Sequence, residues 1–346
     1  MRVFFLYTEL ADYIRKCFEA LAQSGVEVHV VAYPINPEAP FNFDLVNSEV
    51  NYYDRESRTV ANLDNLLKRV NPDAIFCSGW IDSAYNKLLE KWKNKTTTIL
   101  ISDNAYEPNP KSMASVFRAK LLHKHRFSKA FVAGPPQVEY ARKMGFQDEE
   151  IGEGFYTADV AEFSSMINPN FSDSFPKRLV FVGRYLDFKG VFDMWRAFSE
   201  MNNDHWELHC YGTGAEWERR QEHPKIFHHG FVQPSDFEQI VRLGGIFVLP
   251  SLREPWGVVV HEFAAAGFPL ILSDKVNSGR AFLSEKENGV SFKAGSVSSL
   301  KIKMTEMLEK TSSELRQMAE SSKTKAARYT IDRWVSTALN LVKNQE

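Results

Sequence analysis

The sequence predicts an α/β protein whose parallel β-sheets carry helices on both faces. Three observations point to this class. Short apolar runs rich in β-forming residues recur along the chain, segments with helical spacing separate them, and apolar runs stand on both sides of each helical segment. The chain has 346 residues, of which 44% are hydrophobic and 25% charged, so it is long enough for two such domains.

Residues 1–163 are predicted to form the first Rossmann-like domain. Strand and helix patterns alternate there, as βαβ units require. Helical spacing is clearest over residues 10–22 and 60–70. Strands are expected at residues 3–7, 26–32, 74–78, 97–102 and 129–133.

A segment rich in Ser, Asn and Pro, residues 164–178, is predicted to link this domain to a second one. The second Rossmann-like domain is expected over residues 179–327. Its strands are predicted at residues 179–184, 206–211, 245–249 and 269–273. Residues 328–346 are expected to form a last helix, because Trp334 and Leu341 fall on one apolar stripe.

Composition and charge exclude several classes of protein. The formal net charge of -2 argues against a protein whose whole surface binds nucleic acid but leaves room for a local basic patch, and no nucleic-acid partner is expected. Cys17, Cys77 and Cys210 are odd in number and far apart, which fits neither a disulfide framework nor a zinc site and favours a reducing compartment. Residues 1–7 run straight into acidic residues without a small-residue cleavage site, so we expect a first strand instead of a signal peptide. No apolar run approaches the roughly 18 residues needed to cross a bilayer.

The most informative stretch runs from residue 249 to residue 274. An apolar run over residues 245–249 ends in Pro250-Ser251, and a second apolar run covers residues 269–273. Between them lies a segment with room for one short helix. The stretch therefore predicts a strand–loop–helix–strand unit.

Polar residues and a glycine stand at defined places in this unit. Glu254 falls in the loop after the first strand, and Glu262 lies about one and a half turns into the helix. Pro255 suits the start of a helix, and Gly257 leaves the backbone bare where the first helical N–H groups have no partner. Such a helix start attracts phosphate groups. Two glutamates eight positions apart mean little by themselves, because solvated helix faces supply many such pairs.

The spacing Glu254-x7-Glu262, framed by Pro250-Ser251 and by Ala266-Gly267-Phe268-Pro269, resembles the retaining glycosyltransferases of the GT-B fold, family 4, also called group 1 glycosyltransferases. The resemblance implies two Rossmann-like domains that face a central cleft. It also implies a C-terminal helix that crosses back to the N-terminal domain.

The resemblance is specific over residues 179–292 and weak over residues 1–161. In the weaker half, the phrase Phe131-Val-Ala-Gly134 is similar to bacterial surface-polysaccharide members of the family. The resemblance therefore implies a hexosyltransferase-type enzyme of glycolipid or surface-polysaccharide biosynthesis.

A second matching phrase precedes the motif. Gly183-Arg184 and Lys189-Gly190 fit the family's glycine–arginine–x4–lysine–glycine loop, in which two cations beside a flexible turn take the diphosphate of a nucleotide sugar. Without the resemblance, an Arg and a Lys in a solvated loop would be ordinary. Gly212 is expected to form a tight turn beside the nucleotide.

The resemblance also implies roles for residues within the motif. Glu262 is expected to bind the ribose and Glu254 the donor sugar. Gly257 and Val258 are expected at the helix start that faces the phosphates.

The chain is thus expected to be a retaining glycosyltransferase that uses neither a cofactor nor a metal ion. Arg184 and Lys189 would neutralise the leaving diphosphate in place of a divalent cation. Residues 227–232 resemble a strand of the family, and residues 287–292 resemble another. His228 and His229 are adjacent on the first of these strands, so they are expected to point to opposite faces and not to share a metal ion. Two rivals stay open: a GT-B nucleotide-sugar epimerase or phosphorylase, and a catalytically silent nucleotide-sugar-binding protein.

Two departures from the family leave the acceptor to other residues. The first strand runs into Thr8-Glu9 without a glycine-rich loop, so Thr8 or Glu9 would contact the ligands. Many relatives place a histidine after the strand at residues 97–102, where this chain has Asp103 and Asn104. Asp103 either orients the acceptor hydroxyl and stabilises oxocarbenium charge, or caps the next turn of the loop. Thr8, Glu9, Asp103 and Asn104 are the candidate acceptor-binding residues.

Residues 111–129 hold a local excess of positive charge. No acidic residue occurs between Glu107 and Glu139, and Phe117 and Leu121 fall near each other at helical spacing. An interfacial helix on anionic lipid fits this pattern, and so does a solvated helix whose apolar stripe is the domain core. The first alternative predicts a glycan or lipid-linked acceptor and a cytoplasmic enzyme bound peripherally to the inner face of the cytoplasmic membrane. The basic residues are Lys111, Arg118, Lys120, Lys124, Arg126 and Lys129.

Overall fold

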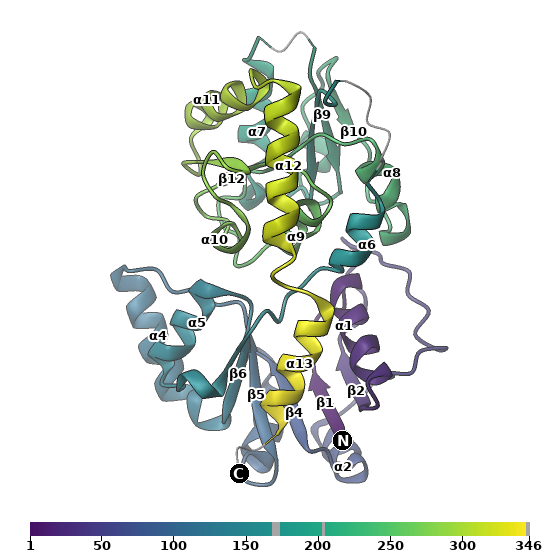
Figure 1. Ribbon diagram of the computed structural model, residues 1–346. Helices are drawn as coiled ribbons and strands as arrows, with labels where there is room; N and C mark the ends of the chain where they lie inside the picture. The colour runs from purple at the N-terminus through teal and green to yellow at the C-terminus, as the bar shows by residue number, and fades with distance from the viewer. Residues whose placement is uncertain (168–173, 203–204, 344–346) are drawn as a thin grey trace. The chain divides into compact units, whose positions relative to one another are not determined.

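The chain folds into two compact units, each built on one parallel sheet with helices packed against it (Figure 1). The computed structural model describes residues 1–167, 174–202 and 205–343. The first unit comprises Met1–Asn36, Phe41–Thr157 and Thr330–Glu346, and the second comprises Pro37–Pro40 and Ala158–Tyr329. The predicted fold class, α/β with two Rossmann-like domains, is confirmed.

The sheet of the first unit has seven strands in the order β3-β2-β1-β4-β5-β6-β7, with parallel neighbours throughout. Its central strands are apolar at nearly every position, as Phe4, Phe5 and Leu6 in β1 illustrate, because both faces of the sheet are covered. The strands are β1 (Arg2–Leu6), β2 (Glu27–Ala32), β3 (Asn51–Asp54), β4 (Ala74–Ser78), β5 (Thr97–Ser102), β6 (Lys129–Val132) and β7 (Ile151–Glu153).

Helices cover both faces of this sheet. On one face, α1 (Asp12–Gln23) and α13 (Ile331–Val342) enclose a core that includes Phe5, Phe18 and Trp334. The opposite face carries α2 (Val60–Val70), α3 (Ser83–Trp92), α4 (Pro110–Leu122) and α5 (Pro135–Met144).

The last helix, α13, is bound into the first unit. The Trp334 side chain is 1% exposed, and its Nε1 donates to the Phe155 carbonyl at 2.8 Å. Lys129 Nζ donates to the Leu341 carbonyl at 2.8 Å, which satisfies one of the carbonyls that a helix end leaves unpaired. The chain therefore passes through the second unit and returns to complete the core of the first.

The sheet of the second unit has six strands in the order β10-β9-β8-β11-β12-β13, again with parallel neighbours. The strand order reverses between β8 and β11. In open parallel sheets, ligands bind at the carboxyl edge beside such a switch point. The strands are β8 (Arg178–Val182), β9 (Glu207–Tyr211), β10 (Ile226–His228), β11 (Ile246–Leu249), β12 (Leu270–Ser273) and β13 (Gly289–Phe292).

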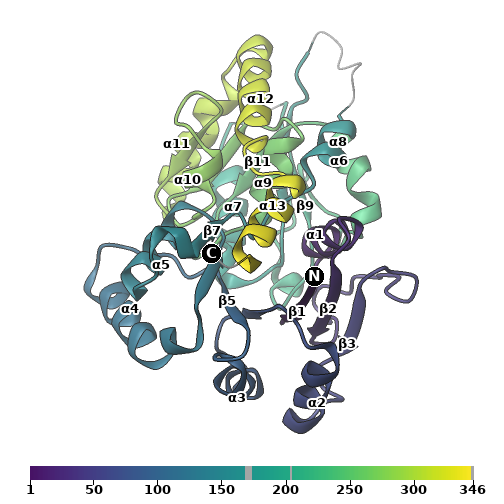
Figure 2. The same ribbon diagram turned by 60° about the horizontal axis from the view of Figure 1, so that its bottom comes forward.

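Helix α9 (Val258–Ala265) connects β11 to β12. It buries apolar residues on several sides, including Val260 and Phe263, as a helix enclosed by a sheet and other helices must. Both views show α12 beside α9 (Figures 1 and 2), and α6 also contacts α9. The other helices of this unit are α6 (Val160–Ser165), α7 (Val191–Ser199), α8 (Phe237–Arg242), α10 (Gly279–Phe282), α11 (Val297–Leu308) and α12 (Ser312–Ala326).

Some boundaries differ from the predicted ones. The units divide after Thr157 instead of residue 163, because α6 packs on α9 and belongs to the second unit. Of the predicted linker, residues 168–173 lie outside the described part of the chain. Strands β3 and β7 were not predicted, since they are only four and three residues long and lack a clear apolar pattern.

Replacing Trp334 should destabilise the first unit. Trp334→Ala removes a buried aromatic side chain, so we expect the free energy of unfolding to fall by about 3–5 kcal/mol. Trp334→Phe keeps much of the volume but deprives the Phe155 carbonyl of its donor, so we expect a loss of about 1–3 kcal/mol. Denaturant titration followed by circular dichroism measures both, with Ser336→Ala on the exposed side of α13 as the control. Unchanged stability of Trp334→Ala would show that α13 is not part of this core.

Candidate functional site

The loops that follow β8 and β11 meet at the switch point of the second sheet. Lys189 ends the 3₁₀ turn Asp187–Lys189 in the first loop, and its Nζ lies 2.5 Å from Glu254 Oε2 in the second. Ser251 Oγ donates to the same carboxylate oxygen at 3.0 Å. Only 15% of the Lys189 side chain and 9% of the Glu254 side chain are exposed. Each charge therefore depends on the other for compensation in a site largely closed to water.

This approach of the two loops requires a glycine at position 190. Gly190 has a φ of +69°, and a Cβ there would lie 2.2 Å from the Pro250 carbonyl oxygen. The Leu252 N–H donates to the Phe188 carbonyl at 2.7 Å, which joins the loops through their backbones. The glycine after Lys189 thus permits the contact between Lys189 and the second loop.

Backbone bonds fix Glu254 where the chain turns from β11 towards α9. The Glu254 N–H donates to the Lys275 carbonyl at 3.2 Å, and Asn277 Nδ2 donates to the Glu254 carbonyl at 3.2 Å. Gly257 follows with a φ of +88°, and a Cβ on it would lie 2.9 Å from Glu254 Cγ. A side chain at position 257 would therefore displace the Glu254 side chain.

Helix α9 begins at Val258, and its N-cap residue, Gly257, has no side chain that could cap the first N–H groups. The expectation that Pro255 starts the helix is wrong, because the chain first forms the turn that holds Glu254. Glu262 lies in the second turn of α9 and is partly exposed. The uncapped helix start, where an anion is stabilised, and both glutamates thus belong to one loop–helix unit.

Arg184 lies in the same loop as Lys189. Its Nη1 donates to Glu38 Oε2 at 3.1 Å, and Glu38 belongs to the short segment Pro37–Pro40 that groups with the second unit. The Arg184 and Glu38 side chains are 38% and 42% exposed. A solvated pair of this kind contributes little to stability and exchanges partners readily.

Gly183 and Gly212 lie at the carboxyl ends of β8 and β9. The Gly183 N–H donates to the Tyr211 carbonyl at 3.0 Å, and the Gly212 N–H donates to the Gly230 carbonyl at 2.6 Å. The residues predicted for the donor thus follow β8, β9 and β11, whose carboxyl ends lie at one edge of the second sheet. They are Gly183, Arg184, Lys189, Gly212, Glu254, Gly257, Val258 and Glu262.

In the first unit, Thr8 lies at the switch point between β1 and β4. Thr8 Oγ1 is 3.3 Å from the Oγ of Ser78, the last residue of β4. The Thr8 carbonyl accepts from the Tyr33 N–H at 2.8 Å, and Glu9 is exposed. Ser78 was not predicted for the site, although it ends a predicted strand and could have been found from the rule that parallel strands share one carboxyl edge.

Asp103 and Asn104 follow β5. Asn104 Nδ2 donates back to Ser102 Oγ at 3.1 Å, and the Asp103 carbonyl accepts from Gln137 Nε2 at 3.2 Å. Burial raises the pKa of the Tyr156 hydroxyl, and the negative charge of Asp103 adds to the rise, so these two side chains lie near each other. Sequence reasoning missed Tyr156 because it follows β7, which has no recognisable pattern.

Within the described residues, no three His, Cys, Asp or Glu side chains are grouped so that they could hold a metal ion. His228 and His229 have different partners. His228 Nδ1 lies 2.9 Å from the Tyr185 hydroxyl, whereas His229 Nε2 lies 3.0 Å from His209 Nδ1.

Helix α4 exposes apolar side chains. Phe117 is 64% exposed and Leu121 62%, while Val116 and Ala119 face the core. The alternative in which the Phe117 stripe is the domain core is therefore wrong. In the described parts of the chain, no helix is long and apolar enough to cross a membrane.

Three of the six basic residues in the stretch 111–129 contact other residues of the first unit. Lys124 Nζ lies 3.9 Å from the centroid of the Phe146 ring, Arg126 Nε donates to Glu90 at 2.8 Å, and Lys129 binds the end of α13. The exposed basic residues on α4 itself are Lys111, Arg118 and Lys120.

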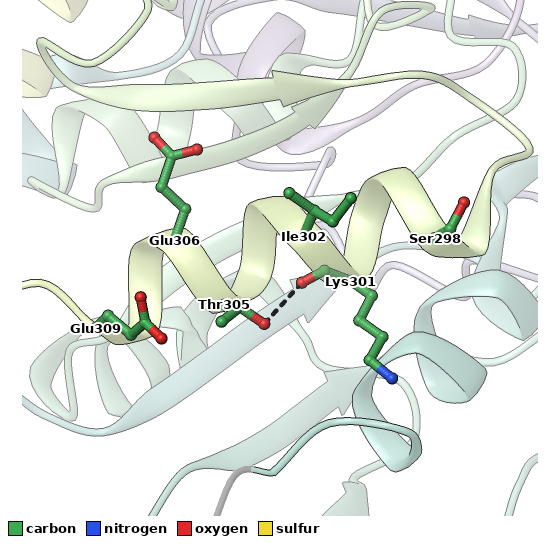
Figure 3. A pocket seen from close by; sticks show the side chains of 6 residues that line it. All are labelled: Ser298, Lys301, Ile302, Thr305, Glu306 and Glu309. Atoms are coloured by element: carbon green, nitrogen blue, oxygen red, sulfur yellow. Dashed lines mark hydrogen bonds between the residues drawn. The ribbon is translucent and has the colours of Figure 1, made fainter.

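A groove of about 530 Å³ lies on α11 (Figure 3). Its lining mixes basic with acidic side chains, so neither sign of charge dominates. None of the lining residues was predicted for the site. They are Ser298, Lys301, Ile302, Thr305, Glu306 and Glu309.

The larger part of the second unit is similar to a known protein family. Residues 164–325 match the family described as glycosyl transferases group 1. The match covers just under half of the chain. It includes Arg184, Lys189, Glu254 and Glu262, the charged residues at the switch point.

Proteins that are similar to part of the chain, or to its whole fold, are distant in sequence. The chain is 32% identical over 125 residues to a glycogen synthase of Mycobacterium tuberculosis, a match that covers 34% of this chain and 30% of that enzyme. A glycosyltransferase from Rickettsia africae aligns with a TM-score of 0.76 at 12% identity and 99% coverage of both chains. HepE from Anabaena in complex with UDP-glucose aligns with a TM-score of 0.76 at 13% identity, over 98% of this chain and 99% of that one. The structural matches show that the whole chain has the GT-B fold.

Separating the buried ion pair should destabilise the second unit. Lys189→Met leaves the Glu254 carboxylate buried without its cation, so we expect a loss of about 3 kcal/mol in the free energy of unfolding. Glu254→Gln should cost a similar amount. The double variant buries no charge at these positions and should recover most of the loss. Denaturant titration of all three gives the coupling energy, and additive losses would contradict pairing of the two side chains in solution.

Proposed function

We propose that this chain is a retaining, metal-independent hexosyltransferase that moves a sugar from a nucleoside diphosphate sugar to an acceptor hydroxyl. The match to group 1 glycosyl transferases supports glycosyl transfer, and the UDP-glucose complex of HepE, which has the same fold, supports the class of donor. The observation that carries the proposal is the contact of Lys189 with Glu254 beside the uncapped start of α9. A cation, a carboxylate and a positive helix end are the groups that a sugar diphosphate needs.

Each donor residue has its own task in this proposal. Arg184 and Lys189 bind the diphosphate and stabilise the charge that develops as it leaves. Glu262 accepts hydrogen bonds from the ribose hydroxyls, and Glu254 accepts one from the sugar. Because Lys189 contacts Glu254 without a donor, its ammonium can bridge the sugar-binding carboxylate and the phosphate.

Transfer breaks the bond between the anomeric carbon and the phosphate oxygen, which keeps the electron pair. A new bond forms from the anomeric carbon to the acceptor oxygen on the same face, and the acceptor proton passes to the departing phosphate oxygen. Thr8, Glu9 and Asn104 bind the acceptor, while Asp103 orients its hydroxyl and stabilises positive charge on the sugar ring. No metal ion is required, because two side-chain cations already face the diphosphate.

A transfer assay in excess chelator tests this function against its rivals. Nucleoside diphosphate sugars are screened by thermal shift, and those that bind are incubated with glycan and lipid-linked acceptors. We expect a product that keeps the anomeric configuration of the donor. Sugar phosphate formed from inorganic phosphate would indicate a phosphorylase, and donor conversion without acceptor would indicate an epimerase. Activity restored only by manganese or magnesium would overturn the metal-independent mechanism.

Glu262 and Glu254 should act on different steps. Glu262→Gln should weaken binding of the free nucleoside diphosphate at least about tenfold, because the ribose loses a charged acceptor. Glu254→Gln should change that affinity by less than about threefold but lower turnover at least about tenfold. Calorimetry gives the affinity and steady-state kinetics the turnover, with Glu306→Gln on α11 as the control. Equal loss of nucleotide binding in both variants would refute this division of roles.

We also propose that the acceptor lies at a membrane surface and that α4 binds this surface. Met113, Phe117 and Leu121 are 59%, 64% and 62% exposed, and their spacing of four residues puts them on one side of the helix. Arg118 and Lys120 lie beside them. Apolar side chains can enter the acyl boundary while the cations meet anionic headgroups, which would hold the enzyme at the inner face of the cytoplasmic membrane.

Replacing the apolar side chains of α4 should release the protein from anionic lipid. Phe117→Ser with Leu121→Ser should lower the fraction that sediments with phosphatidylglycerol vesicles at least about fivefold, because the buried apolar area is lost. Ile302→Ser on α11 is the matched control, since Ile302 is also 64% exposed. Neutral vesicles should bind the wild type weakly. Equal sedimentation of the wild type and the α4 variant would remove α4 from any membrane contact.

A further inference from the structure

His261 lies inside the second unit, on α9, between the two glutamates of the motif. It is 0% exposed, yet both ring nitrogens are hydrogen-bonded. The Ala158 N–H donates to Nδ1 at 2.9 Å, and Nε2 lies 3.0 Å from the Ala326 carbonyl oxygen. The ring is therefore neutral with its proton on Nε2, because only this tautomer accepts at Nδ1 and donates at Nε2. Burial lowers the pKa of His261 to about 4, in agreement with a neutral ring.

The two partners of His261 stand where the chain passes between the units. Ala158 is the first residue of the second unit after the division at Thr157, and Ala326 ends α12 shortly before the chain returns to the first unit at Thr330. Figure 1 shows α12 beside α9 and leading on to α13. We call the two places where the chain passes between the units the crossings, residues 157–158 and residues 326–330. The His261 side chain thus binds a backbone atom at each crossing.

Other contacts tie the crossings to the same helix. Ser164 Oγ, in α6 after the first crossing, donates to the Ala265 carbonyl of α9 at 3.3 Å. The ring of Tyr329, the last residue of the second unit, packs edge-on against the His261 ring with centroids 6.2 Å apart. The opposite end of α9 carries the uncapped helix start and the turn of Glu254.

We propose that His261 is a positioning residue. Its two hydrogen bonds attach the backbone of both crossings to α9, so that a movement at either crossing displaces the helix that forms the donor site. Because its ring is fully buried, we do not expect it to touch the donor or the acceptor. A histidine suits the task because one planar ring can accept from one backbone and donate to another on its opposite side. The expected effect on glycosyl transfer rests on the proposed function, whereas the attachment of the crossings to α9 does not.

A merely space-filling role makes a different prediction. An apolar ring of similar volume would then replace His261 without effect on the crossings. Asn and Gln separate the two bonds, because the amide of Asn reaches the place of Nδ1 and the amide of Gln reaches that of Nε2. His261→Asn should therefore keep the hydrogen bond with the Ala158 N–H, and His261→Gln should keep the one with the Ala326 carbonyl. His261→Phe should form neither.

The direct test is amide hydrogen exchange of Ala158 in the full chain labelled with ¹⁵N-alanine. We expect exchange at least about tenfold faster in His261→Phe and His261→Gln, and within about threefold of the wild type in His261→Asn, since a lost hydrogen bond opens the crossing locally. If the exchange rate of the Ala158 amide is unchanged in His261→Gln and His261→Phe, His261 does not attach the first crossing to α9. If His261→Phe does not fold, the contrast between Asn and Gln decides the question.

Enzyme kinetics test whether the loss of a His261 hydrogen bond affects the donor site. In His261→Gln we expect turnover to fall at least about fivefold while the affinity for the free nucleoside diphosphate changes by less than about twofold, because the donor residues stay in place but the geometry of transfer is less well held. Faster amide exchange with unchanged turnover would refute the effect on the donor site but not the attachment of the crossings. Absence of transfer in the wild type would refute the proposed function and leave the exchange result standing.

Discussion

The contact between the loop after β8 and the loop after β11 is the constraint on which the candidate site depends. Lys189 and Glu254 compensate each other's charge where little water reaches them, and Ser251 shares the carboxylate oxygen. Two charges that are poorly hydrated must stay paired or find another partner. A diphosphate that binds here would enter a site in which the lysine is already held in place, so the ordering of its long side chain is largely complete before the donor arrives.

Glycines at two positions make this contact possible. Gly190 lets the first loop pass against the Pro250 carbonyl, and Gly257 leaves room for the Glu254 side chain at the start of α9. The same short helix then carries Glu262 and, one residue earlier, His261. The proposed ribose-binding residue and the proposed anchor of the chain crossings are therefore adjacent in the sequence and lie on one helix, which suits a site whose geometry must be held closely.

Much of the fold could be predicted because its determinants are local. Helix α2 has the predicted bounds Val60–Val70, since its apolar spacing is regular and Thr59 caps it, and the buried runs of β4 and β5 also lie where they were expected. Strand β7 has three residues and no pattern, so neither the strand nor Tyr156 after it could be found. The start of α9 was misplaced at Pro255 because a turn that depends on distant partners, Lys275 and Asn277, precedes it.

The same distinction applies to the site. Arg184, Lys189, Glu254 and Glu262 stand in local patterns that a sequence displays, but the pairing of Lys189 with Glu254 depends on the strand order of the sheet. The partners of His261 are backbone atoms of residues 158 and 326, which have no signature in the sequence. The exposure of Phe117 likewise follows from the orientation of α4 on its sheet, and helical spacing alone could not separate an interfacial stripe from a buried one.

The central claim is that the switch point of the second sheet binds the nucleoside diphosphate part of a sugar donor. Hydrogen exchange with and without a saturating nucleoside diphosphate, read by mass spectrometry across the whole chain, tests this claim most directly. We predict protection in the peptides that cover residues 183–190 and 254–262. Protection confined to the groove on α11, or to the first unit, would contradict the account.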